Sequence, residues 1–211
     1  MHLLNQNIKF PDVSHATEDG LLAIGGDLSV ERLVYAYKHG IFPWFSEGEP
    51  ILWWSPDPRF VLFPEKLKVS KSMKQVLRKN GYVVTVNKNF RAVITECSKA
   101  KRQGQTDTWI TNDMIEAYIK LHQLGYAKSV EVWEKNELVG GFYGIDLSNG
   151  VFCGESMFSK KSNASKVAFV TFIQNTNYKL IDCQVYTNHL ESLGAEEISR
   201  EVFLKYLKQK F

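Results

Sequence analysis

Residues 129–155 read SVEVWEKNELVGGFYGIDLSNGVFCGE and determine the fold class of this chain. Three short runs there contain β-branched and aromatic residues and are bounded by turn segments, which is the pattern of strands, at Ser129–Glu134, Glu137–Ile145 and Val151–Glu155. Lys135-Asn136 separates the first two runs and Ser148-Asn149-Gly150 separates the last two, and both segments are typical of hairpin turns. We therefore expect three consecutive strands that form an antiparallel meander.

Helices and further strands flank this meander on both sides. Capping residues and helical spacing predict helices that begin near Ser29, Ser70, Asn89 (reaching about Arg102), Thr111, Asn163 and Ser199. Strands are expected at Tyr82–Val86 and Lys179–Val185. This mixture predicts an α+β fold with a mostly antiparallel sheet. Prolines in the aromatic segment 41–60 preclude a long helix, and we expect a small N-terminal domain, residues 1–62, followed by a second domain, residues 63–211.

The composition excludes several classes of protein. A chain of 211 residues that is 44% hydrophobic and 23% charged has ordinary globular composition and is not disordered or fibrous. Three cysteines without a Cys-x-x-Cys pair argue against a disulfide framework, and five scattered histidines argue against a metal site. No apolar run approaches the ~18 residues of a membrane span, and the start lacks the pattern of a signal peptide. We expect a cytoplasmic monomer without membrane contact.

Positive charge is concentrated in one segment of the chain. Residues 66–102 contain eleven basic residues and one acidic residue, whereas residues 1–65 contain four basic and nine acidic residues. A local excess of this size produces a field that attracts polyanions. Two interpretations are open at this point: a nucleic-acid or phosphate partner, or lysine-rich helix faces that are merely solvated.

Three polar residues of the expected strands are candidates for chemistry. Asp182 and Gln184 alternate with apolar residues, so period-two geometry places both on one face of their strand, and Glu155 ends another strand. Burying a polar group costs free energy unless the group is hydrogen-bonded or has a function. A purely structural pair that is hydrogen-bonded to the backbone is therefore about as plausible as a functional pair. A glycosidase with two carboxylates is weakly indicated, and a nucleophilic Cys153 or Cys183 is disfavoured because neither has an evident histidine partner.

Eight longer strings are more specific than any of these single residues. They are Gly20-Leu-Leu-Ala-Ile-Gly-Gly-Asp-Leu-Ser29, His39-Gly-Ile-Phe-Pro-Trp-Phe45, Ile51-Leu-Trp-Trp-Ser-Pro-Asp-Pro-Arg59, Thr108-Trp-Ile-Thr111, Glu137-Leu-Val-Gly-Gly141, Phe152-Cys-Gly-Glu-Ser-Met-Phe-Ser159, Asn163-Ala-Ser-Lys166 and Ile181-Asp-Cys-Gln184. In sequence and in order they resemble the bacterial leucyl/phenylalanyl-tRNA–protein transferases. The resemblance covers the chain from about residue 20 to its end.

This resemblance implies an activity, partners and a fold. Members of the family transfer leucine or phenylalanine, and methionine less well, from aminoacyl-tRNA to the α-amino group of proteins that begin with Arg or Lys. The products are marked for degradation. The implied fold is a small N-terminal domain joined to a GNAT-like (acetyltransferase-like) catalytic domain, and no cofactor or metal is implied. The chain lacks the Gln/Arg-x-x-Gly-x-Gly/Ala loop with which true acetyltransferases bind acyl-CoA, which favours tRNA as the acyl carrier.

The resemblance also implies roles for individual residues. Gln184 would orient the attacking amine, Asp182 would support it, and Glu155 would hold a polar group of the aminoacyl end. The side chain of the donor would occupy an apolar pocket formed by Trp44, Trp109, Phe142, Phe152, Phe169, Phe172 and Ile181. Phosphates of the tRNA would bind the basic residues Lys71, Lys74, Arg78 and Lys79.

Two alternative functions remain at this point. One is a related aminoacyltransferase with a different donor or acceptor, and the other is a non-catalytic tRNA-binding module with the same fold. Asp182 and Gln184 favour an enzyme, because a module that only binds tRNA has no evident use for them.

Overall fold

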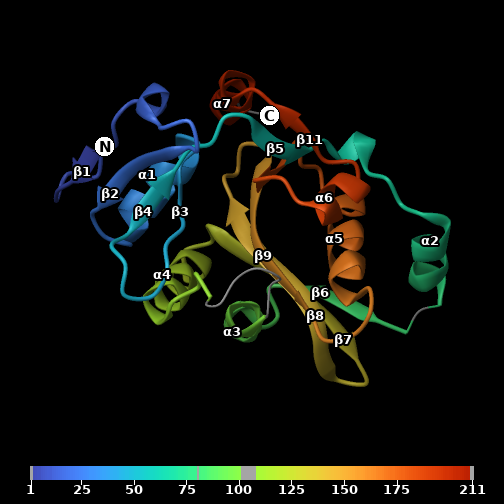
Figure 1. Ribbon diagram of the computed structural model, residues 1–211. Helices are drawn as coiled ribbons and strands as arrows, with labels where there is room; N and C mark the ends of the chain where they lie inside the picture. The colour runs from blue at the N-terminus through green and yellow to red at the C-terminus, as the bar shows by residue number, and fades with distance from the viewer. Residues whose placement is uncertain (1, 80, 101–107, 210–211) are drawn as a thin grey trace.

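The computed structural model describes residues 2–79, 81–100 and 108–209 (Figure 1). Strands of the described chain form two sheets. The smaller sheet has the order β1-β2-β4-β3 and is made of β1 His2–Leu4, β2 Leu21–Gly25, β3 Phe42–Pro43 and β4 Leu52–Trp54. The larger sheet has the order β11-β5-β10-β9-β8-β7-β6 and is made of β5 Arg59–Leu62, β6 Val83–Val86, β7 Ala127–Glu134, β8 Glu137–Asp146, β9 Val151–Ser159, β10 Leu180–Gln184 and β11 Glu196–Ile198.

Helices accompany both sheets. They are α1 Val30–Lys38, α2 Lys71–Arg78, α3 Phe90–Lys99, α4 Asn112–Gln123, α5 Ala164–Gln174, α6 Asn188–Ser192 and α7 Arg200–Lys208. Side-chain caps are present at five of the six expected helix starts, where an oxygen of Ser29, Ser70, Asn89, Thr111 or Ser199 accepts a backbone N–H of the first turn, whereas Asn163 makes no such hydrogen bond. The helix that was expected to reach about Arg102 is shorter and ends at Lys99, because Ala100 is already extended; Arg102 itself lies outside the described residues. Helix α6 and strand β11 were not expected from the sequence.

The meander expected from residues 129–155 is confirmed as β7, β8 and β9, which pair antiparallel in that order. Lys135 and Asn136 both have positive φ angles of 48° and 66°, as a two-residue turn of this hand requires. Gly144 of β8 lies so close to β9 that a Cβ atom there would be 2.3 Å from the carbonyl oxygen of Cys153. The β9 strand is longer than expected and continues to Ser159.

Both faces of the larger sheet are covered by helices, with α5 on one side and α3 and α4 on the other (Figure 1). Alternation along β8 divides the core accordingly. Phe142 belongs to the buried cluster beneath α5, and Tyr143 belongs to the cluster that also contains residues of α1, α3 and α4. Strand β10 pairs parallel with β9 and antiparallel with β5, so the sheet is mixed but mostly antiparallel, as the sequence predicted.

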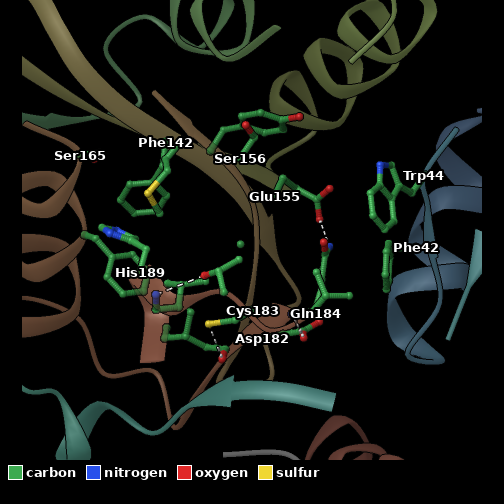
Figure 2. Close-up of a pocket in the computed structure, with 18 of the residues that line it drawn as sticks. Phe42, Trp44, Phe142, Glu155, Ser156, Ser165, Asp182, Cys183, Gln184 and His189 are labelled. Carbon is green, nitrogen blue, oxygen red and sulfur yellow. Dashed lines mark hydrogen bonds between the residues drawn. The ribbon is translucent and has the colours of Figure 1, made fainter. Parts of the chain in front are cut away.

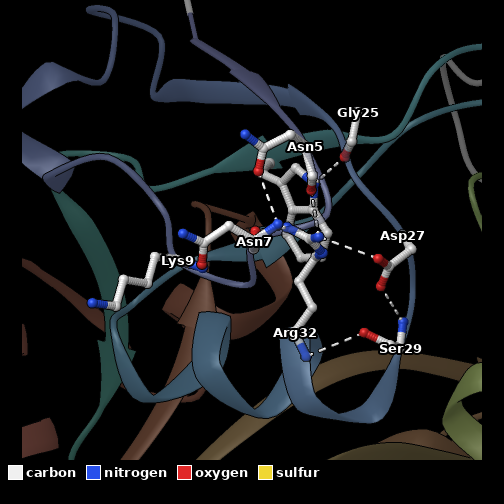
Figure 3. A network of polar contacts seen from close by, with 8 residues as sticks. Asn5, Asn7, Lys9, Gly25, Asp27, Ser29 and Arg32 are labelled. Carbon is white, nitrogen blue, oxygen red and sulfur yellow. Dashed lines mark hydrogen bonds and ion pairs between the residues drawn. The ribbon is translucent and has the colours of Figure 1, made fainter.

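A buried arginine ties the start of the chain to α1 (Figure 3). Arg32 donates from Nη1 to the carbonyl oxygen of Asn7 at 3.0 Å and from Nη2 to that of Asn5 at 2.8 Å. It also pairs with Asp27 at 3.2 Å. The residues before β2 are therefore held against the small sheet by side-chain contacts as well as by β1.

We propose that the chain divides into units near the expected residues 1–62 and 63–211. Support comes from the two sheets, of which the smaller contains residues of the first range only. Strand β5, which ends the first range, pairs with β10 and β11 of the second, so the covalent connection itself is built into the larger sheet.

Candidate active site

A cavity of about 460 Å³ opens where the two parallel strands β9 and β10 separate. Their pairing ends at Asp182 opposite Cys153, and the residues that follow on both strands line the cavity. Glu155 and Gln184 lie near Trp44 and Phe42 of the N-terminal unit, whereas Phe142, Ser165 and His189 lie at the opposite end (Figure 2). The cavity therefore joins an apolar end near α5 to a polar end that faces the small sheet.

Five of the seven residues expected to form an apolar pocket line this cavity: Trp44, Trp109, Phe142, Phe169 and Ile181. Phe152 and Phe172 do not line it, which corrects that part of the expectation. Both are buried in the core behind the wall, where Phe172 packs on Phe142 at 5.3 Å and on Phe152 at 4.9 Å between ring centroids. They support the wall of the cavity without reaching its interior.

The three polar candidates are brought together at one end of the cavity. Gln184 donates from Nε2 to Oε1 of Glu155 at 2.9 Å, and the hydroxyl of Tyr118 donates to Oε2 of Glu155 at 3.2 Å. Tyr118 is in turn hydrogen-bonded to Tyr37 of α1. Because its amide nitrogen is engaged, Gln184 presents its carbonyl oxygen as the free acceptor, and no donor among the described residues occupies it.

Glu155 is the carboxyl group whose proton affinity is most relevant to chemistry here. Burial, together with the neighbouring Asp182 charge, raises the pKa of Glu155 from 4.5 to about 8, even though hydrogen bonds from the two tyrosines and the charge of Arg59 act in the opposite direction. A carboxyl group with such a pKa changes its charge close to neutral pH, and a cation bound beside it would favour the ionised form.

Asp182 is fully buried and does not stand free in the cavity. Its two oxygens accept hydrogen bonds from Nε and Nη2 of Arg59 at 2.8 and 2.7 Å, a bidentate ion pair. Its Oδ1 also accepts the backbone N–H of Gln184 at 2.9 Å. The sequence did not single out Arg59, since nothing in the spacing indicates that a residue 123 positions away pairs with Asp182.

Several other lining residues were missed as well. They are Phe42, Met157, Ser165, Thr187, His189 and Leu190, together with Tyr118 and Tyr37 behind Glu155. The sequence offers no other indication of these residues than that most lie in or near the eight quoted strings. An isolated aromatic or hydroxyl residue does not reveal whether its side of a strand or helix will face a cavity.

The cysteines do not have the environment of nucleophiles. Burial raises the pKa of both the Cys153 and the Cys183 thiols, so the thiolate is disfavoured. Within the described ranges, no group of three or more His, Cys, Asp or Glu side chains is arranged to hold a metal ion.

The four basic residues expected to contact tRNA lie together on the surface. Lys71, Lys74 and Arg78 belong to α2, Lys79 follows its last turn, and all four are exposed. Helix α2 lies on the far side of α5 from β9 (Figure 1), so this basic surface is separate from the cavity wall. No helix of the described chain is long and apolar enough to cross a membrane.

Comparison with solved structures gives distant similarities. A GCN5-related N-acetyltransferase from Kribbella flavida is 12% identical, with a TM-score of 0.39 over 77% of this chain and 58% of that chain. The C-terminal domain of a putative lysylphosphatidylglycerol synthetase from Agrobacterium fabrum is 10% identical, with a TM-score of 0.38 over 81% and 56%.

Comparison with protein families and curated sequences gives much closer similarities. Residues 61–208 match the model of the leucyl/phenylalanyl-tRNA protein transferases, and residues 26–57 match the model of the N-terminal domain of the same enzymes. Leucyl/phenylalanyl-tRNA–protein transferases from Flavobacterium johnsoniae and Syntrophus aciditrophicus are 62% and 56% identical, covering 100% and 98% of this chain and 100% and 87% of their own lengths. Matches of this extent on both units mean that the chain belongs to the leucyl/phenylalanyl-tRNA–protein transferase family.

Proposed function

We propose that this protein transfers leucine or phenylalanine from leucyl-tRNA or phenylalanyl-tRNA to the α-amino group of proteins that begin with Arg or Lys. The observation that carries the proposal is the cavity between β9 and β10, which combines an apolar end with the hydrogen-bonded pair Glu155–Gln184. The apolar end suits an uncharged donor side chain, and the polar pair suits amino groups. We further propose that the enzyme acts as a monomer in the cytoplasm, where aminoacyl-tRNA is made, and marks its products for degradation.

The reaction converts an ester into an amide and needs positioning more than activation. The acceptor nitrogen bonds to the aminoacyl carbonyl carbon, the bond to the ribose oxygen breaks, and the proton lost by the nitrogen goes to that oxygen. An α-amino group has a pKa of about 7.7–8.0, so a useful fraction is already the neutral nucleophile near pH 7. Correct placement of the two reactants then supplies much of the rate enhancement.

Gln184 is proposed to place the attacking amine. Its Nε2 is held by Glu155, so the carbonyl Oε1 can accept a hydrogen bond from the amine and aim the nitrogen lone pair at the ester. Asp182 supports this arrangement through the backbone N–H of Gln184.

Glu155 is proposed to bind the α-ammonium group of the aminoacyl donor. The ammonium charge would stabilise the ionised carboxylate, which burial otherwise disfavours. The donor side chain would then extend toward the apolar end, against Phe142, Phe169 and Ile181, with Trp44 and Trp109 at other parts of the wall. Such a pocket distinguishes apolar side chains by only roughly 1–3 kcal/mol per methylene. It should therefore also accept methionine, as a weaker donor than leucine or phenylalanine.

Basic residues on α2 are proposed to bind the tRNA backbone. Reversing two charges with Lys74→Glu and Arg78→Glu should raise the dissociation constant for aminoacyl-tRNA and lower its log–log salt dependence by about two. At saturating tRNA the transfer rate should be unchanged, because the cavity does not include α2. Filter binding at several salt concentrations measures both quantities.

A matched control reverses two exposed lysines of α7, with Lys205→Glu and Lys208→Glu, which changes the net charge equally. If this control weakens tRNA binding as much as the α2 variant, general charge and not α2 determines affinity, and the assignment of this surface is wrong.

The function is tested by transfer of labelled leucine from leucyl-tRNA to a protein that begins with Arg, compared with the same protein beginning with Met. Incorporation only into the Arg acceptor supports the reaction and the acceptor class. Incorporation from a different charged tRNA, or into a different acceptor, would indicate the related aminoacyltransferase. Binding of tRNA without any transfer would indicate the non-catalytic module.

A further inference from the structure

Arg59 occupies an unusual position for an arginine, since it is 1% exposed at the junction of three parts of the molecule. Besides its bidentate pair with Asp182 of β10, its Nη1 donates to the carbonyl oxygen of Gly40 at 3.3 Å. The guanidinium carbon lies 4.8 Å from the ring centroid of Phe42 and 4.6 Å from that of Phe203. One side chain thus contacts the N-terminal unit, the strand of Gln184 and the last helix.

The pair with Asp182 controls the backbone that carries Gln184. The register of β10 against β5 shifts between Asp182 and Gln184, and Gln184 has a φ angle of 65°, which non-glycine residues rarely adopt. Pairing with β9 has ended at this point, and the N–H of Gln184 is instead accepted by Oδ1 of Asp182, the oxygen that also accepts Nε of Arg59. The guanidinium therefore determines where the carboxylate sits, and the carboxylate holds the turn at Gln184.

The contact with Gly40 connects the same guanidinium to the opposite wall of the cavity. Gly40 immediately precedes the segment with Phe42 and Trp44, which line the cavity across from Gln184. A buried ion pair of this kind is seldom retained for stability, because the cost of removing two charges from water offsets most of their attraction. The Arg59–Asp182 pair can position both walls of the cavity, whereas two apolar residues of equal size could not make these hydrogen bonds.

We propose that Arg59 is a positioning residue of the transfer reaction, which sets Gln184 through Asp182 and holds the Phe42–Trp44 wall at the matching distance. The inference rests on the proposed function, because it concerns the placement of the amine by Gln184. Lysine cannot substitute, since a single ammonium cannot bind both oxygens of Asp182 and the Gly40 carbonyl in the planar arrangement that guanidinium provides.

The test compares Arg59→Lys with wild-type enzyme in steady-state transfer of leucine, with tRNA binding measured separately. Arg59→Lys keeps the charge opposite Asp182 and should fold, yet its kcat should fall by at least about tenfold, because small displacements of reacting groups are costly. Its dissociation constant for tRNA should stay within about twofold, since α2 is not involved. A role confined to stability would leave kcat per folded molecule unchanged.

A second variant removes the pair without leaving a buried charge. Arg59→Met combined with Asp182→Asn should fold, as judged by urea titration, and should lose about 100-fold or more in kcat. The matched control is Arg200→Met, whose guanidinium binds the Ser55 carbonyl at 2.6 Å in the turn just before Arg59 and does not contact β10. It should transfer at a rate close to wild type.

Three outcomes separate the possibilities. Loss of kcat in both Arg59 variants with retained tRNA binding supports the inference. A kcat near wild type in Arg59→Lys, or an equal loss in Arg200→Met, would overturn it while leaving the proposed function intact. Absence of transfer in the wild-type enzyme would instead overturn the proposed function itself.

Discussion

Replacing Asp182 with alanine should reduce transfer by at least about 100-fold while tRNA binding is retained. The substitution removes the acceptor of the Gln184 N–H and leaves Arg59 buried without its partner. Gln184 would then lose the contact that holds its left-handed backbone, and the amine would no longer be placed. Loss of one partner of a buried pair should also lower the free energy of unfolding by about 3–5 kcal/mol.

The effect on chemistry is separated from the effect on stability by two measurements. Urea titration gives the folded fraction, and Asp182→Asn, which keeps the volume and one acceptor oxygen, should fold better than the alanine variant and still transfer slowly. Asp146→Ala serves as the control, because Asp146 likewise forms an ion pair, with Lys128, but does not line the cavity. Transfer by folded Asp182→Ala at a rate near wild type would show that the role given to Asp182 is wrong.

Replacing Glu155 with glutamine should change the pH dependence of transfer. Below pH 7, log kcat/KM of the wild-type enzyme should rise with pH with a slope of two, because two groups must lose a proton. These groups are the acceptor amine and Glu155, whose pKa is about 8. Glutamine keeps an oxygen to accept from Gln184 Nε2 but has no proton to lose, so the slope of log kcat/KM against pH should fall from two to one. The lost charge should reduce kcat/KM by about 10–100-fold, the value of a hydrogen bond to a charged group.

The same substitution should increase stability, with a sign that follows from the raised pKa. Between about pH 4.5 and 8 the folded protein keeps the Glu155 proton that the unfolded chain has lost, so wild-type stability falls as pH rises through this window. The slope cannot exceed about 1.4 kcal/mol per pH unit, the value for one proton, and it decreases toward both ends of the window, where the folded and unfolded states differ by less than one proton. Glu155→Gln should therefore gain most over wild type near pH 8 and least near pH 5.

Thermal unfolding of both proteins between pH 5 and 8 measures this gain. An equal difference at every pH would mean that Glu155 titrates normally in the folded protein. The kinetic slope would then have to come from another group, and the binding of the donor ammonium by Glu155 would lose its support.

Local sequence pattern by itself predicted the strands of the meander and the starts of the main helices. It also led to the expectation of two domains. In residues 129–155, short runs with β-branched and aromatic residues specify strands because turn residues bound each run. Ser29, Ser70, Thr111 and Ser199 specify helix starts because their side chains satisfy free N–H groups. Strand patterns singled out Glu155, Asp182 and Gln184, all of which line one cavity, and the long strings identified the family and with it the expected roles of these residues.

Only the tertiary structure decided how these residues work together. Arg59 meets Asp182 across 123 positions of sequence, and Tyr37 and Tyr118 reach Glu155 from two different helices. Phe152 and Phe172 could not be distinguished from the lining aromatics in advance, because a phenylalanine in a core and one in a cavity wall obey the same local pattern. The cavity exists because β9 and β10 stop pairing after Cys153 and Asp182, and such a separation depends on long-range packing that no local spacing records.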